Sequence, residues 1–351
     1  MKSPFNKNNV PRLLKEVSQT PGWVLCVGAG ISLPVFPTWK ELICEIILDL
    51  NTNNGNEALE IINEFNADSI IQAAYNLSGY DEEQFTSYLT ETLYKKIKNE
   101  LSPEEWHLYC EATSVTSPGG INSTKWKTLH EVLDKVFKNS SLIPTAQNVA
   151  ATIGTELEPK AIISFNVEPS LLLYLNSILL RKEDVSKGHS IPKQFDIITR
   201  SISTNYKDRI PFIYCHGFLP PNNDIKKREL VANEKLVFSE NSYLELVNNS
   251  YSWQSSTFLS LCSQSRLIFL GLSLTDPNLR RWLSWVQTNR SEEIRKIYGS
   301  VKDSTNHYWI NKHPGNSEKA KWIESTVAHL GVRLIWIDSW SEIDEVFKKI
   351  F

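Results

Sequence analysis

The chain has 351 residues, of which 41% are hydrophobic and 22% are charged, and its formal net charge is −3. This is the composition of a globular protein with enough apolar material for a large buried core. A near-neutral charge without a dense run of Lys and Arg gives no reason to expect direct nucleic-acid binding. The N-terminus lacks the apolar region of a signal peptide, and no apolar run is long enough to span a bilayer. We therefore expect a cytoplasmic protein without membrane contact.

The first predicted strand is the apolar run from Trp23 to Val27, which ends at a Gly-x-Gly turn formed by Gly28 and Gly30. Glycine lets the backbone bend sharply and approach a ligand closely, and the helix N-terminus that follows suits a pyrophosphate. The dinucleotide fingerprint has a third glycine where this chain has Leu33, so the turn alone is a weak signal. It either binds nucleotide phosphates or only connects a strand to a helix.

A long helical region follows this turn. The segment PTWKELICEIILDL has apolar positions at helical spacing, and the same periodicity continues from Ala58 to about Val136. Polar joints at NTNNGN and TSPGGINST interrupt it. We interpret residues 51–145 as a helical module inserted after the first strand and helix.

Strands and helices then alternate to the end of the chain. A strand at Ala161–Ser164 precedes a helix in EPSLLLYLNSILL, and a polar, irregular span precedes the strand IPFIYCHG. KLVFSENSYLELV predicts a short strand, a turn and a helix capped near Ser239. RLIFLGLSLTDPNLRRWLSWV predicts a buried strand, a tight polar turn and a helix. The remaining segments predict strands in HYWIN and VRLIWI and helices in SEKAKWIESTVAHLG and SEIDEVFKKI.

This alternation predicts an α/β fold, a Rossmann-like doubly wound parallel sheet with a helical insertion module. We expect one domain over residues 1–351, whose nucleotide-binding core is formed by residues 20–50 and 146–351. Ligands of such sheets bind beyond the carboxyl ends of the strands. Four predicted strands end there in polar or glycine residues: Gly28–Ser32, Ser164–Asn166, His216–Gly217 and Gly271–Ser273.

The polar residues at these strand ends also have purely structural explanations. His216 would only cap nearby carbonyls, and Asn166 would be the N-cap of the next helix. Ser273 and Asp276 fit helix caps, because Pro277 suits a first helical turn. Their common position at strand ends favours a shared site.

Five cysteines, an odd number, lie far apart and mostly inside apolar runs, which predicts buried reduced thiols. They are Cys26, Cys44, Cys110, Cys215 and Cys262. No Cys-x-x-Cys pair occurs, so we expect no zinc and no other metal site.

Six segments in a fixed order carry a resemblance to a known family. GAGIS with PTW, SFNVEPSL, CHG, LVFSENSY, FLGLSLTDPNL and GVRLIWID resemble the motifs of sirtuin-like NAD-binding domains, in particular the bacterial NAD-hydrolase branch used in antiphage defence. The resemblance spans roughly residues 20 to 351, and the combined order is more specific than any one motif. It implies a single sirtuin-like domain that takes NAD as its substrate.

The resemblance implies that residues at both glycine turns bind the dinucleotide. Gly271 and Ser273 would approach its phosphate and adenosine side. The first loop would cradle it through Gly28, Ala29, Gly30 and Ser32. Because a basic phosphate loop is absent, we expect the backbone N–H groups of Gly28 to Ser32 to bind the phosphates.

The resemblance also implies catalytic roles for Asn166 and His216. Asn166 would hold the nicotinamide ribose and the attacking water, and His216 would act as the base near the ribose hydroxyls. A neutral histidine accepts a proton at physiological pH, and an asparagine orients both partners without adding a charge. Two departures stand out. Glu168 replaces the usual Asp near the carboxamide, and the loop LPVFPTW is one residue shorter than usual and lacks its glycine.

The implied function is an NAD+ hydrolase that gives nicotinamide and ADP-ribose and depletes NAD as an abortive-infection effector. The alternative is a non-catalytic NAD or ADP-ribose-binding regulatory subunit, which has no need of both Asn166 and His216. A protein deacylase is less favoured because its four-cysteine zinc ribbon is missing after the His-Gly motif. A dehydrogenase is disfavoured by Leu33 and by the histidine at the third strand end.

Uncontrolled NAD hydrolysis would kill the host, so we expect a trigger. It lies in self-assembly as a homo-oligomer, in the helical insertion, or in a separate polypeptide. Short chains of this family are often paired with a hexameric DNA-translocating ATPase of the HerA type or with an Argonaute-like protein, and we expect a partner of this kind.

Overall fold

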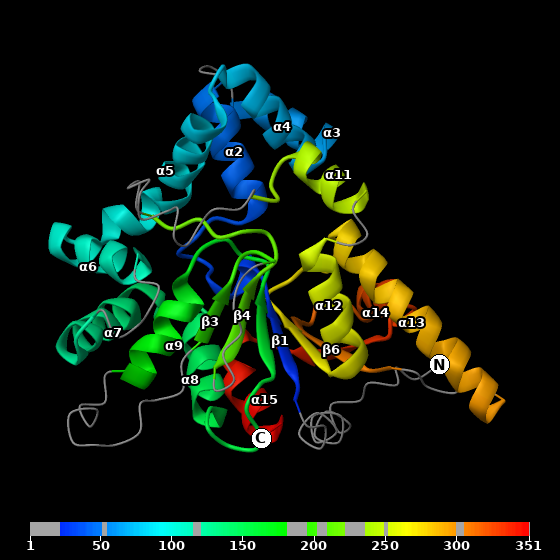
Figure 1. The fold of residues 1–351 in the computed structure, drawn as a ribbon. Coiled ribbons are helices and arrows are strands. Elements are labelled where there is room, and N and C mark those ends of the chain that lie inside the picture. Colours follow the sequence, from blue (N-terminus) through cyan, green and yellow to red (C-terminus); the bar gives the residue numbers. More distant parts are fainter. Residues whose placement is uncertain are drawn as a thin grey trace.

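The computed structural model describes residues 22–50, 55–114, 121–180, 195–201, 209–221, 236–248, 252–299 and 305–350. Within these ranges, seven strands form one sheet in the order β3-β4-β2-β1-β5-β6-β7, and every paired strand is parallel to its neighbour (Figure 1). The strands are β1 Val24–Val27, β2 Ala161–Ser164, β3 Phe195–Ile198, β4 Ile210–Tyr214, β5 Leu267–Leu270, β6 His307–Lys312 and β7 Val332–Ile337. The predicted Rossmann-like α/β fold is confirmed.

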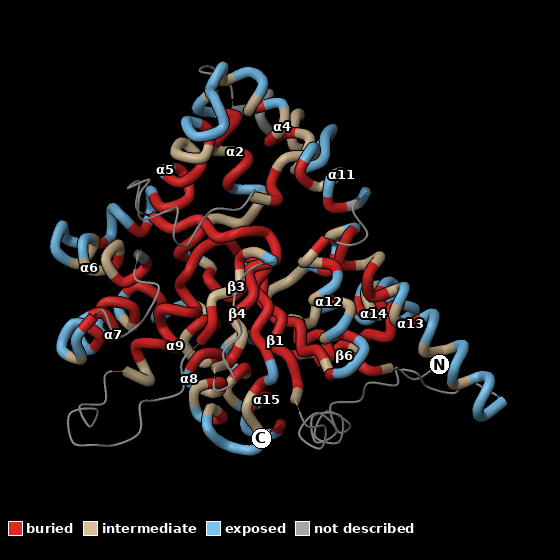
Figure 2. The backbone as a smooth tube through the Cα atoms, viewed as in Figure 1, coloured by how far each residue is buried: buried red, intermediate tan, exposed pale blue. Residues whose placement is uncertain are grey.

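Helices cover both faces of the sheet, so its central strands are buried throughout (Figure 2). In β1, Leu25 and Val27 join one buried cluster while Val24 and Cys26 join the other, because successive side chains of a strand point to opposite faces. The first face packs against α7 Ser123–Phe137, α8 Leu142–Thr152, α9 Ser170–Leu180 and α15 Ile343–Ile350. The second face packs against α12 Trp253–Gln264, α13 Pro277–Tyr298 and α14 Ser317–Ala328.

The helical region after β1 has two parts. Its first helices lie beyond the carboxyl ends of the strands, where α11 Glu240–Asn248 contacts α4 (Figure 1). Its last helices, α7 and α8, pack against α9 beside the sheet. The bounds of the others are α2 Trp39–Leu50, α3 Gly55–Glu64, α4 Ala67–Ser78, α5 Glu82–Glu100 and α6 Pro103–Ser114.

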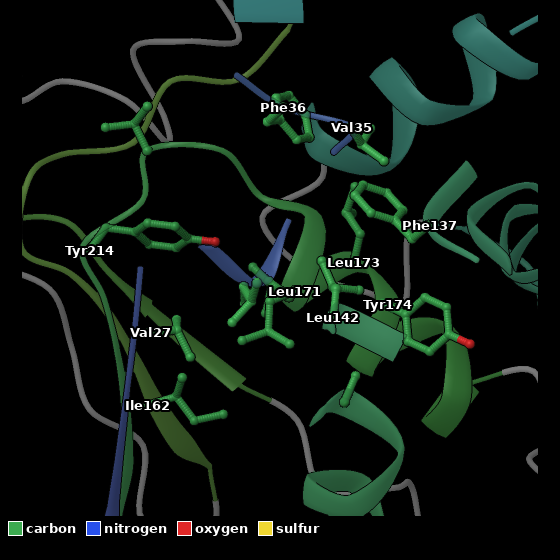
Figure 3. Close-up of a cluster of buried hydrophobic side chains, with 14 of the residues drawn as sticks. Val27, Val35, Phe36, Phe137, Leu142, Ile162, Leu171, Leu173, Tyr174 and Tyr214 are labelled. Carbon is green, nitrogen blue, oxygen red and sulfur yellow. The ribbon is translucent and has the colours of Figure 1, made fainter. Parts of the chain in front are cut away.

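Buried side chains anchor the loop between the first glycine turn and α2. Val35 and Phe36 lie near Phe137 in the close-up of Figure 3, which also shows Val27 of β1. The ring of Phe36 stacks on Phe137 at a centroid distance of 6.3 Å and meets the edge of Tyr94 at 5.4 Å. This loop is therefore fixed to helices α5 and α7 by packing.

One predicted strand is wrong. The segment before α11, at residues 236–238, is a turn, and Val237 N donates to the carbonyl of His216 at 3.0 Å. Val237 and Phe238 are nevertheless buried. These apolar residues pack into the core without pairing in the sheet, and their apolar sequence therefore led to the strand prediction.

The edge strand β3 and the helices α8 and α12 were not predicted. The four residues of β3 include Asp196, which is buried because it pairs with Arg209 at 3.4 Å. A charged residue in so short a segment hides the strand pattern. α12 is rich in serine, and Ser252 caps it by accepting a hydrogen bond from the N–H of Ser255.

The cysteines are unpaired thiols, and Cys26, Cys215 and Cys262 are buried while Cys44 and Cys110 are half-buried. Burial raises the pKa of the Cys262 thiol to about 12. Across the described ranges, no group of three or more His, Cys, Asp or Glu side chains is arranged to hold a metal ion. No helix in the described part of the chain has the length and apolar character needed to cross a membrane.

Candidate functional site

The two glycine turns meet at the point where the strand order changes direction. β1 has β2 on one side and β5 on the other, so the turns after β1 and β5 are neighbours. Gly28 N donates to the carbonyl of Leu270 at 3.0 Å, and Gly30 N donates to that of Gly271 at 2.9 Å. This switch point is where open α/β sheets bind their ligands.

The close approach of the two turns requires glycine. A Cβ on Gly28 would lie 2.6 Å from the carbonyl oxygen of Gly271, and one on Gly30 would lie 2.8 Å from the Cα of Gly271. Gly271 itself has a φ of +67°, in the left-handed region that favours glycine. These glycines are therefore needed to pack one turn against the other.

Most backbone N–H groups of the first turn are bonded within the protein, whereas they were predicted to be available to phosphates. Besides those of Gly28 and Gly30, the N–H of Ile31 donates to the carbonyl of Gly28 at 3.2 Å and that of Ser32 donates to Ala29 at 3.1 Å. Four of the five N–H groups that were expected to bind phosphates thus have protein acceptors. Of these five N–H groups, that of Ala29 donates to no backbone carbonyl among the described residues.

Gly30→Val is accordingly expected to destabilise the fold. The added side chain must displace the Gly271 backbone, and such overpacking costs about 1–3 kcal/mol of unfolding free energy. Denaturant melts would measure the loss, with Ala29→Val as the control because Ala29 is half-buried in the same turn and lines the cavity. Native stability of Gly30→Val would contradict the proposed packing role.

Two adjoining cavities open at this edge of the sheet. The larger has a volume of about 640 Å³, within the usual range of small-molecule sites, and the smaller about 50 Å³. All nine residues predicted to form the site line one or both. The larger cavity is lined by Gly28, Ala29, Gly30, Asn166, His216, Gly271 and Ser273, and the smaller by Ala29, Ser32, Asn166 and Glu168.

The helical region and α11 supply the other walls of the larger cavity. Trp39 and Lys40 come from the start of α2, Asp68 from the first turn of α4, and Tyr243 from α11. Trp39 meets the edge of the Phe238 ring at a centroid distance of 4.7 Å, and both residues border both cavities. Trp39, Phe238 and Tyr243 lie in the quoted motifs PTW and LVFSENSY, but sequence reasoning assigned none of these wall residues to the site, because only tertiary packing brings them to the strand ends.

A buried carboxylate holds the end of β2 to the first loop. Glu168 is 6% exposed, and its Oε1 accepts hydrogen bonds from Ser32 Oγ at 2.5 Å and from Asn166 Nδ2 at 3.1 Å. Its Oε2 accepts from the N–H of Ser170 at 2.7 Å. Three donors thus stabilise the buried group and fix its place.

The amide of Asn166 is held in one orientation. Because Nδ2 donates to the carboxylate of Glu168, the amide oxygen Oδ1 points away from it. The Asn166 backbone is also fixed, since its N–H donates to Ser164 Oγ at 3.1 Å. Asn166 does not cap α9, because this helix begins at Ser170 and Glu168 accepts its first N–H.

His216 follows β4 between two aromatic rings. The centroid of its imidazole lies 5.3 Å from that of Phe165 and 5.8 Å from that of Tyr243, both nearly perpendicular to it. The residue is 5% exposed, and neither ring nitrogen has a hydrogen-bond partner among the described residues. The explanation that its ring caps carbonyls is therefore not supported.

Asp276 approaches this imidazole from the start of α13. Its Oδ1 caps the helix by accepting from Asn278 N at 2.7 Å and Leu279 N at 3.3 Å, which confirms the predicted cap. Its Oδ2 lies 3.1 Å from Nε2 of His216, although the ring N–H is not aligned well enough for a hydrogen bond. Burial alone would raise the pKa of Asp276, but His216 and the two helical N–H groups hold it below its usual value.

A family model described as a SIR2-like domain matches residues 180–335. The matched segment contains His216, Gly271 and Ser273, whereas the first loop and the end of β2 lie before it. The match supports a sirtuin-like domain, and such a domain fits NAD-dependent activity. The chain has no match among curated proteins.

Proposed function

We propose that this protein is an NAD+ hydrolase that cleaves the nicotinamide–ribose bond with water and releases nicotinamide, ADP-ribose and a proton. One observation carries the proposal: Asn166 and His216, both buried polar residues at strand ends, line the same cavity at the switch point of the sheet. Neither ring nitrogen of His216 makes an aligned hydrogen bond among the described residues, and its charged neighbour is the Asp276 carboxylate at 3.1 Å, so the ring can bond to a ligand in this cavity.

The residues that hold Asn166 also define its role. With Nδ2 bonded to Glu168, Oδ1 accepts a hydrogen bond from the ribose or from the attacking water. His216 takes up a proton from a ribose hydroxyl or from that water. The two side chains serve an oxocarbenium-like transition state, for which alignment matters more than a strong acid.

The walls of the larger cavity fit the rest of a dinucleotide. Both glycine turns expose backbone surface there, so an extended ligand can lie close to them. Lys40 is the single Lys or Arg among the described residues that line this cavity, and it supplies positive charge for the phosphates. With four loop N–H groups bonded within the protein, we assign phosphate binding to Lys40 and the N–H of Ala29.

The purified protein is expected to convert NAD to nicotinamide and ADP-ribose without any acetylated peptide. Chromatography of NAD incubated with the protein, alone and together with the product of a neighbouring gene, measures this conversion. Consumption of NAD that requires an acetyl-lysine peptide and removes its acetyl group would identify a deacylase. Binding of NAD without cleavage would identify a regulatory subunit.

We further propose that NAD depletion is the antiphage output of this protein and that activation acts through the helices above the cavity. α2 and α4 contribute Trp39, Lys40 and Asp68 to its wall, so a movement of these helices changes the site directly. A second copy of the chain, a HerA-type ATPase or an Argonaute-like protein bound to this module would act in this way.

A further inference from the structure

The two carboxylate oxygens of Asp276 serve different groups. Oδ1 accepts the N–H groups of Asn278 and Leu279, as an N-cap does. Oδ2 is buried, lies 3.1 Å from Nε2 of His216 and has no hydrogen-bond partner among the described residues. The cap accounts for one oxygen and leaves the other unexplained.

The loop before α13 is held in an unfavourable conformation that places this carboxylate. Leu274 has a φ of +54°, which non-glycine residues rarely adopt. Arg280 stabilises the loop by donating to the carbonyl of Leu274 at 3.0 Å and to that of Thr326 at 2.8 Å. Ser273 and Thr275 add a hydrogen bond between their hydroxyls at 2.7 Å.

Asp276 is the charged group next to the imidazole. Burial, followed by the charges of Asp276 and Asp68, raises the pKa of Tyr243 far above its usual value. Burial and then Asp276 raise the pKa of Cys215 to about 12. Both groups are neutral at physiological pH and Phe165 is apolar, so Asp276 is the anionic group among these neighbours of the ring.

We propose that Asp276 is a positioning residue that fixes the tautomer of His216. The carboxylate draws the ring proton to Nε2 and leaves the lone pair on Nδ1, which has no hydrogen-bond partner among the described residues. A small rotation of the ring between Phe165 and Tyr243 aligns Nε2–H with Oδ2, since hydrogen bonds of this kind often tighten when a ligand binds. The catalytic consequence, proton uptake at Nδ1, rests on the proposed NAD hydrolysis.

The tautomer is measured without any reaction. In protein labelled with ¹⁵N-histidine, with His216 assigned by loss of its signals in His216→Gln, we expect the native ring to carry its proton on Nε2. In Asp276→Asn the new amide donates to Nε2, so the proton moves to Nδ1. Asp276→Ser removes the carboxylate and gives a mixture. Both replacements preserve the N-cap.

Asp81→Asn is the matched control, because Asp81 caps α5 with its side chain and does not line the cavity. Its His216 signals should equal those of the native protein. The proposal is overturned if the tautomer is unchanged in both Asp276 variants, in protein with a native melting temperature. If Asp276→Asn fails to fold, the Asp276→Ser spectrum decides.

Activity separates this inference from the proposed function. In the activated protein, we expect Asp276→Asn to lower kcat about a hundredfold or more with KM changed by less than about threefold, since a wrong tautomer disables a histidine base. Asp81→Asn should retain full turnover. A tautomer reversal in a protein that never cleaves NAD would keep the positioning role and refute the hydrolase. NAD cleavage by the native protein, with the tautomer unchanged in both Asp276 variants, would support the hydrolase and refute the positioning role.

Discussion

Asn166→Ala and His216→Ala are each expected to lower NAD turnover by about a hundredfold or more while folding and assembly persist. The reason is that, in the proposed mechanism, both side chains act on the reacting ribose. His216→Ala removes the ring packed between Phe165 and Tyr243 and the neighbour of the buried Asp276 carboxylate, and Asn166→Ala removes the bond from Nδ2 to Glu168. The cost in stability should be about 1 kcal/mol for Asn166→Ala and about 1–3 kcal/mol for His216→Ala.

The double variant provides a sharper measurement. Because both residues act on one transition state, their effects should be non-additive, and the double variant should be scarcely slower than either single variant. All three should also lose the toxic or protective effect of the active protein in cells. Two well-folded single variants that still drain cellular NAD after activation would refute the mechanism.

The sheet could be predicted because its strands are buried on both faces. Apolar runs without polar alternation, such as 161–164 and 267–270, end at polar or glycine residues, and the structure has buried strands there. The strand β3 was not predicted, because it contains the charged residue Asp196, whose ion-pair partner Arg209 lies in a different segment. The apolar turn at 236–238 was mistaken for a strand, because a short apolar run does not show whether it pairs.

The site residues at strand ends could be predicted from the sequence. The site residues that depend on contacts between distant segments could not. The order of strands brings Asn166 and His216 to one cavity, as expected. The positioning role proposed for Asp276 gives no sequence signal, since an N-cap before Pro277 explains that residue fully. Gly28 and Gly30 indicated a tight backbone turn with a close contact, but the sequence did not show that this contact is with the backbone of Gly271.

Glu168→Ala is expected to impair both stability and turnover. The carboxylate is buried and accepts hydrogen bonds from Ser32 Oγ, Asn166 Nδ2 and the N–H of Ser170. Removal leaves these buried donors without an acceptor, at a cost of about 1–3 kcal/mol each when water does not replace it. Because the Asn166 amide is then no longer held, turnover should fall by about a hundredfold. Chemical denaturation and NAD hydrolysis measure the two effects.

Glu168→Gln distinguishes positioning from simple packing, because it preserves the size of the side chain. One glutamine oxygen cannot accept all three donors, and its NH₂ group must face either Ser170 N–H or the pair formed by Ser32 and Asn166. We expect kcat to fall about tenfold or more with little change in KM. Glu105→Gln is the matched control, since Glu105 accepts a backbone N–H from Ser102 at 2.8 Å at a surface site outside both cavities. Full turnover in Glu168→Gln would show that the carboxylate only fills space, and that the orientation of Asn166 does not depend on it.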